Sequence, residues 1–121
     1  MKQQLMVIIM KVQIIELSEK WIAVRYNDSM IYLVDEKGTY IAIDDVVVVP
    51  WFYRETIKSL LRKLRKMKII KKTPKIETIT DEQIPYKKQR IAFQLHYHYG
   101  SERGRELYRY FRSLLNSNKS R

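Results

Sequence analysis

Short apolar segments separated by polar turns fill most of the first fifty residues, and this pattern limits the fold more than any other feature. Strands are predicted over residues 10–17, 21–26, 30–34, 39–43 and 46–49. Each connecting turn contains only two to four residues, and Asn, Asp, Ser and Gly are frequent in these turns. Because connections this short join neighbouring antiparallel strands, residues 10–50 predict a β-meander. Four or five such strands are enough to close a small barrel.

Three details of this segment carry further expectations. The alternation within residues 10–17 slips at Ile14 and Ile15, which is typical of a β-bulge. The uninterrupted apolar run Val46–Val49 predicts a strand that is buried on both faces. Residues 1–9 are expected to form either an additional edge strand or a loose tail.

Pro50 separates the strands from a predicted amphipathic helix over residues 51–68. Proline suits the first turn of a helix, because the N–H group that it lacks would have no partner there. One face of the helix is apolar and contains Tyr53, Ile57, Leu60, Leu61, Leu64 and Met67. The opposite face is cationic and contains Arg54, Lys58, Arg62, Arg65 and Lys66. The apolar face is therefore expected to pack on the sheet, which leaves the cationic face for a ligand.

The second half of the chain has a less regular pattern. Residues 69–89 are interpreted as a basic loop or hairpin, because prolines interrupt the apolar pairs there. Residues 90–99 predict a strand, and residues 101–115 predict a second helix with a polar tail over 116–121. That helix is predicted to have an apolar face of Leu107, Tyr110, Phe111 and Leu114, opposite a basic face of Arg105, Arg109 and Arg112. The whole chain, residues 1–121, is expected to be one α+β domain.

Positive charge is concentrated in the second part of the chain. Residues 1–50 contain 5 Lys/Arg and 7 Asp/Glu, a net charge of −2, whereas residues 51–121 contain 19 and 6, a net charge of +13. The run over residues 62–75 holds 8 cations and no acid. Because like charges at this density repel one another, the sequence predicts a polyanionic partner.

The predicted function is a non-enzymatic nucleic-acid-binding protein that neutralises the phosphate backbone, as viral or mobile-element proteins do among others. The expected phosphate contacts are Arg54, Lys58, Arg62, Arg65, Lys66, Lys71, Lys72, Arg90, Arg105, Arg109 and Arg112. If both helices pack on the same sheet, their outward basic faces are expected to join into one continuous surface. DNA and RNA fit such a surface equally well.

The predicted strand over residues 90–99 presents a second polar set. Arg90, Gln94, His96 and His98 alternate with apolar residues and therefore share one face. Basic and hydrogen-bonding groups beside aromatic residues are typical of a platform for single-stranded nucleic acid. An ordinary solvent-facing side of a strand is the other interpretation.

The tripeptide His96-Tyr97-His98 resembles the His-hydrophobe-His signature of the HUH nickases and transposases. The resemblance implies that His96 and His98 bind a divalent metal ion and that Tyr108 or Tyr110 attacks a DNA phosphate. The strand spacing agrees with this, because residues i and i+2 share a face and both imidazoles are able to reach one ion. The chain departs from the family because Tyr108 follows His98 by only 10 positions. A metal-dependent nickase or nuclease is thus one alternative function; apart from it, no metal and no cofactor is predicted.

A protein-directed role is the other alternative. An inhibitor or an assembly subunit of a nucleic-acid machine would pair with a partner, or with a second copy of the chain, through the edge of the N-terminal sheet. The aromatic run Trp51-Phe52-Tyr53 is interpreted as packing at the helix entry, and an exposed member of it would serve as an anchor for a partner.

Composition excludes several other classes. The absence of cysteine excludes disulfides, thiolate metal sites and cysteine nucleophiles. The longest uncharged apolar stretch near the N-terminus, Leu5–Met10, is too short for a signal-peptide core or a membrane span, so a cytoplasmic location without membrane contact is expected. The three glycines are too scattered to form a phosphate-binding loop.

Overall fold

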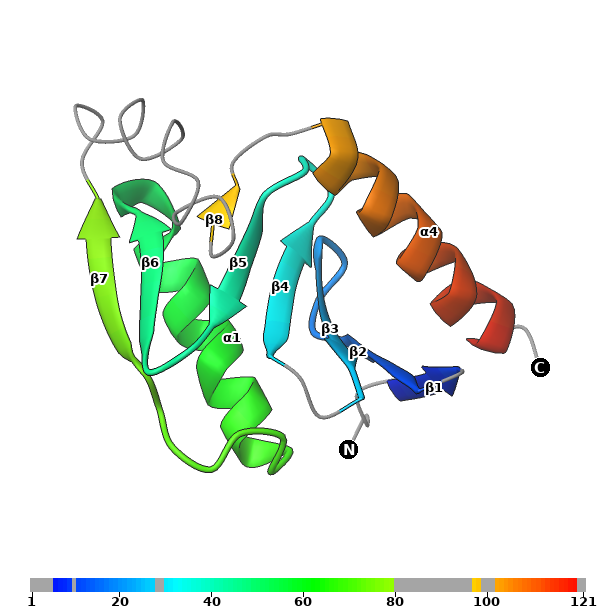
Figure 1. Ribbon diagram of the computed structural model, residues 1–121, viewed down its shortest axis with the longest axis horizontal. Helices are drawn as coiled ribbons and strands as arrows, with labels where there is room; N and C mark the ends of the chain where they lie inside the picture. The colour runs from blue at the N-terminus through cyan, green and yellow to red at the C-terminus, as the bar shows by residue number, and fades with distance from the viewer. Residues whose placement is uncertain (1–5, 10, 28–29, 80–96, 99–101, 120–121) are drawn as a thin grey trace.

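The computed structural model describes residues 6–9, 11–27, 30–79, 97–98 and 102–119 (Figure 1). In chain order its elements are β1 (Met6–Ile9), β2 (Val12–Glu16), β3 (Trp21–Tyr26), β4 (Ile31–Asp35), β5 (Tyr40–Ile43), β6 (Val46–Pro50), the 3₁₀ helix η1 (Trp51–Tyr53), α1 (Arg54–Lys66), β7 (Lys75–Ile79), β8 (Tyr97–His98) and α4 (Glu102–Lys119). The predicted α+β character is therefore confirmed.

The N-terminal strands as far as β5 form the predicted antiparallel meander, but β6, which was expected to be its last strand, belongs to a different sheet. Strands β1 to β5 pair in sequence order, and β8 adds to β5, which gives one six-stranded sheet. Residues 6–9 form the additional strand that was one of two expectations for the N-terminus, and they lie at one edge of the sheet. Within the described part of the chain β1 and β8 do not pair, so the sheet stays open instead of closing into a barrel.

Both faces of the central strands are buried. Ile14 and Ile15 are neighbours in β2 with no exposed surface, and they belong to two different clusters of buried residues. Alternation places them on opposite faces of the sheet. The predicted bulge at this position is wrong, because Ile14 pairs with Val24 and Ile15 with Ala23 in uninterrupted register.

Each face of the sheet is covered by one helix (Figure 1). The first cluster joins Ile15 to Ile57, Leu61 and Leu64 of α1 and to Val47 and Val49 of β6. The second joins Ile14 to Tyr108, Phe111 and Leu115 of α4. The two helices consequently lie on opposite sides of the sheet.

Strands β6 and β7 form a separate parallel pair with α1 as the crossover between them. Their register runs from Val46 opposite Lys75 to Pro50 opposite Ile79. Parallel neighbours need a long connection, and α1 supplies it. The expected loop or hairpin is thus wrong for Lys75–Ile79. The expected two-sided burial of β6 is wrong too, because Val46 is 40% exposed.

Helix α1 begins later and ends earlier than residues 51–68. Pro50 is the last residue of β6, and η1 intervenes before α1 starts at Arg54. The predicted apolar face is confirmed, since Ile57, Leu60, Leu61 and Leu64 are buried. At the other end Lys68 has a φ of 62°, and the amides of Lys68 and Ile69 donate to the carbonyl oxygens of Arg65 and Leu64 at 3.0 Å each. These two hydrogen bonds form a Schellman motif, with lysine where glycine is usual.

Helix α4 is longer than predicted and is rotated about its axis. It continues to Lys119, so the tail expected over residues 116–121 is helical for most of its length. Its buried residues include Tyr108 and Leu115, whereas Tyr110, expected on the apolar face, is 59% exposed. The strand expected over residues 90–99 is represented by β8, and its other residues lie outside the described part.

Two neighbouring substitutions test the two-sided sheet. Ile14→Ala and Ile15→Ala should each lower the free energy of unfolding by about 2–5 kcal/mol, because each removes a buried side chain from a different cluster. Urea unfolding of both variants measures this. A strand with one solvated face would lose stability at only one of the two positions, and that result would contradict the fold described above.

Candidate functional site

The exposed cations of α1 and of the segment that follows it form the most highly charged part of the described molecule. This set, named here the α1 basic surface, consists of Arg54, Lys58, Arg62, Arg65, Lys66, Lys68, Lys71, Lys72 and Lys75; all are exposed except Lys58, which is half-buried. Residues 54–75 contain ten Lys/Arg and one Asp/Glu, so they carry +9 of the chain's net charge of +11.

Among the described residues no ion pair joins this surface to an acid. The ion pairs of the described part lie elsewhere, between Arg105 and Glu102 and between Arg112 and Glu16. Two arginines of the surface have neutral partners instead. Arg54 donates to the Thr78 hydroxyl and Arg65 to the Thr73 hydroxyl, both at 3.1 Å. These bonds fix the guanidinium groups beside β7 and the preceding loop without compensating their charge.

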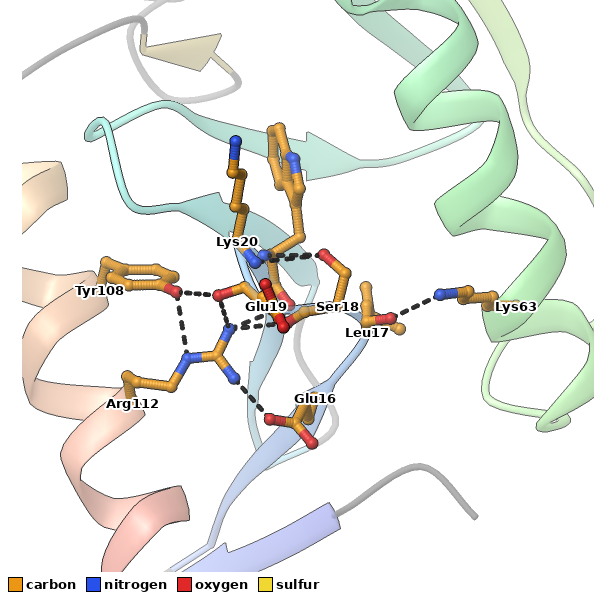
Figure 2. A network of polar contacts seen from close by, with 9 residues as sticks. Glu16, Leu17, Ser18, Glu19, Lys20, Lys63, Tyr108 and Arg112 are labelled. Carbon is orange, nitrogen blue, oxygen red and sulfur yellow. Dashed lines mark hydrogen bonds and ion pairs between the residues drawn. The ribbon is translucent and has the colours of Figure 1, made fainter. Parts of the chain in front are cut away.

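The tenth cation of the segment, Lys63, serves the fold. Its Nζ donates to the backbone carbonyl oxygen of Leu17 at 2.6 Å, and its side chain is half-buried. It bridges α1 to the turn between β2 and β3 (Figure 2).

Two aromatic residues lie at the beginning of α1. Trp51 is 54% exposed and Phe52 is 39% exposed, and their ring centroids are 5.4 Å apart in an edge-to-face arrangement. Tyr53 differs, because it packs edge-on against the buried Trp21 at 5.5 Å. Of the residues 51–53, Tyr53 therefore packs at the helix entry, as first interpreted. Trp51 and Phe52 are exposed, which is the alternative that the sequence left open.

The predicted contacts on α4 do not join the α1 basic surface. Because α1 and α4 cover opposite faces of the sheet, their outward sides face away from each other (Figure 1). The expectation of one continuous basic surface is wrong for this reason. Of the α4 residues, Arg109 is exposed and Arg105 pairs with Glu102 at 3.0 Å.

Arg112 is engaged inside the protein, in a network with the turn between β2 and β3 (Figure 2). Its Nη1 donates to Glu16 Oε2 at 2.8 Å, and its Nη2 donates to the carbonyl oxygens of Ser18 at 2.8 Å and Glu19 at 3.0 Å. Its Nε donates to the Tyr108 hydroxyl at 3.1 Å. The guanidinium group thus satisfies several carbonyl oxygens of a tight turn.

The residues of the HUH resemblance are only partly described. Tyr108 is 8% exposed, and its hydroxyl donates to the Glu19 carbonyl oxygen at 2.8 Å. His98 belongs to β8, whereas His96 and Arg90 lie outside the described residues. No group of three or more possible metal-ligating side chains occurs in the described part. Tyr108 is therefore a packing residue of the Arg112 network in this structure.

A cleft of about 500 Å³ lies between the β2–β3 turn, the β4–β5 turn and the beginning of α1. Asp35 is buried in its wall: one carboxylate oxygen accepts from the amides of Lys37 at 3.1 Å and Thr39 at 2.8 Å, and the other accepts from the Tyr53 hydroxyl at 3.1 Å. Burial raises the pKa of the Asp35 carboxyl above its ordinary value. The sequence pattern predicts only a turn over residues 35–38, because it gives no sign that the Tyr53 hydroxyl reaches back to this turn.

A smaller cavity of about 170 Å³ lies between the sheet and α4. Tyr26, Tyr32 and Tyr40 line it together with Arg103 and Phe111. Burial raises the pKa of the Tyr26 and Tyr40 hydroxyls. These tyrosines come from three adjacent strands, a juxtaposition that the sequence pattern did not reveal.

Comparisons of the chain with protein-family models, with curated proteins and with solved structures gave no match. The charges and side chains of the surface itself are therefore what can indicate a function for this protein.

The Arg112 network predicts a large difference between two arginines of one helix. Arg112→Lys should lower the free energy of unfolding by about 1–3 kcal/mol, because an ammonium group lacks the planar fork that reaches several acceptors. Arg109→Lys, on an exposed position of α4, should change it by less than about 0.5 kcal/mol. Chemical denaturation of both variants measures the difference, and equal effects would show that the network contributes little.

The raised pKa of Asp35 predicts a pH-dependent contribution to stability. The pKa of this carboxyl is near 3.8 in the unfolded state and higher in the folded state, so the folded state binds the proton more strongly. The contribution of Asp35 to the free energy of unfolding therefore falls as the pH rises above about 3.8. Asp35→Asn keeps the site neutral. Its stability relative to the wild type should therefore increase between about pH 3 and pH 7. Thermal unfolding of the wild type and the variant across this pH range measures the change, with Glu36→Gln as the control. A stability difference between Asp35→Asn and the wild type that does not vary with pH would refute the raised pKa of Asp35.

Proposed function

We propose that this protein is a non-enzymatic nucleic-acid-binding protein that neutralises phosphates with the α1 basic surface. The observation that carries the proposal is a set of nine cations, eight of them exposed, within residues 54–75, a segment that contains one acid; none of the nine forms an ion pair among the described residues. Such a surface is electrostatically unfavourable in the free protein, and a polyanion relieves the repulsion.

The dimensions of the surface suit a phosphate backbone. Helix α1 contains 13 residues, so at about 1.5 Å per residue it is about 20 Å long. A duplex carries about one negative charge per 1.7 Å of its axis, so the same length of duplex offers more phosphates than the surface has cations. Lysine and arginine at helical spacing contact phosphates without reading bases, which supports binding without strict sequence preference.

A membrane surface fits these features less well. Amphipathic helices that bind lipid insert their apolar face, and in α1 this face is buried against the sheet. Among the described residues no helix has the length and apolar character needed to cross a membrane. An acidic protein is the remaining polyanion, and nuclease treatment separates it from a nucleic acid: material captured from cell extract should be released when the nucleic acid is degraded.

The salt dependence of binding tests the proposal. Five to eight of the cations are expected to pair with phosphates, so log affinity should fall against log salt with a slope of about −5 to −7. The triple variant Lys58→Gln, Arg62→Gln, Lys66→Gln should bring the slope about 2–3 closer to zero and weaken binding at low salt. Fluorescence anisotropy of a labelled oligonucleotide measures both.

A charge-matched variant provides the control. Lys20→Gln, Lys37→Gln, Arg109→Gln removes the same three charges from exposed positions outside the α1 basic surface, and its slope should stay near that of the wild type. An affinity that is unchanged between about 50 and 500 mM salt, or equal losses in the two triple variants, would reject this binding surface.

A further inference from the structure

Trp51 and Phe52 form an exposed aromatic pair at one end of the α1 basic surface. Trp51, at 54%, is more exposed than any large hydrophobic residue of η1 or α1. Its ring and that of Phe52 are in edge-to-face contact. Single exposed hydrophobic residues are ordinary in soluble proteins, but two adjacent aromatics beside nine cations are a more specific combination.

The aromatic pair and the cations continue along the same side of the helix. Trp51, Arg54, Lys58 and Arg62 follow at intervals of three or four residues, the spacing of one helical stripe. The buried residues of α1, which include Ile57 and Leu61, form the neighbouring stripe that packs on the sheet. A strand that lies along the cations therefore reaches the aromatic pair at the N-terminal end of the helix.

Arg54 links the two features. It follows η1 directly, and its guanidinium group is held by the Thr78 hydroxyl of β7 at 3.1 Å. An anion bound by Arg54 lies within one helical turn of Trp51 along the chain. In a nucleic acid the base and its phosphate are separated by one sugar, so a base on the aromatic pair brings its phosphate toward Arg54 and Lys58.

We infer that the α1 basic surface binds single-stranded nucleic acid, with an unpaired base stacked on the ring of Trp51, beside Phe52, and the adjoining phosphates on Arg54 and Lys58. This inference rests on the proposed function and names its ligand class. Bases within a duplex have their faces covered by neighbouring pairs, whereas an unpaired base offers its π face to an aromatic side chain. Stacking of this kind is independent of sequence, as is phosphate contact, so the two parts of the surface favour the same ligand.

The two tryptophans of the chain make stacking observable. Trp21 is 5% exposed and lies in the core, whereas Trp51 is on the surface. Binding of a short oligothymidylate should quench the fluorescence of Trp51 and leave that of Trp21 unchanged. A Trp51→Phe variant isolates the Trp21 signal, and its emission should not respond to the same titration.

Three ligands of equal length separate base stacking from phosphate contact. These are the oligothymidylate, an abasic strand with the same phosphates, and a duplex. The wild type should bind the oligothymidylate about 5- to 150-fold more tightly than the abasic strand, the range that corresponds to stacking of one base. Trp51→Leu, which keeps an apolar side chain without a π face, should remove this preference, and Trp51→Phe should retain part of it.

The controls distinguish a failure of this inference from a failure of the proposed function. The variant Lys58→Gln, Arg62→Gln, Lys66→Gln should weaken binding of all three ligands to a similar degree. Equal affinity of the wild type for the oligothymidylate and the abasic strand would overturn the stacking site while leaving phosphate binding intact. If Trp51→Leu still prefers the oligothymidylate to the abasic strand, the stacking site is overturned as well. If the wild type binds none of the three ligands at low salt, both proposals are overturned.

Discussion

Burial of both faces of the central strands is the constraint on which the rest of the structure depends. Ile14 and Ile15 cannot both avoid water unless each face of the sheet has its own cover. Helix α1 covers one face together with β6 and β7, and α4 covers the other (Figure 1). This arrangement directs the outward side of α1 away from α4, so the basic residues of the two helices lie on opposite sides of the sheet.

The turn between β2 and β3 connects the two covers. Lys63 of α1 donates to the carbonyl oxygen of Leu17, while Arg112 and Tyr108 of α4 donate to that of Glu19 (Figure 2). Carbonyl oxygens at a strand end need donors, and here cations from both helices supply them. Lys63 and Arg112, which the sequence places in basic segments, thus hold the fold together, whereas the other cations of α1 form no ion pair within the described residues.

The sequence predicted those features that depend on local periodicity. The meander followed from short apolar segments and polar turns, and the core side of α1 followed from the spacing of Ile57, Leu61 and Leu64. Features that depend on packing between distant segments were missed. The parallel pairing of β7 with β6 has no local signal. Helix α4 has several similarly apolar stripes, and only its packing on the sheet decides which of them is buried. For this reason Tyr110 was expected inside and Arg112 outside. Of the candidate surface, the cations were predictable, but the exposure of Trp51 was not.

The end of α1 shows what the charge of this surface costs the protein. Lys68 holds a left-handed backbone conformation, in which a residue with a Cβ atom is less favourable than glycine by about 1 kcal/mol. A glycine there would relieve that strain but would remove a cation from the densest part of the chain. The residue present gives up conformational stability and keeps the charge.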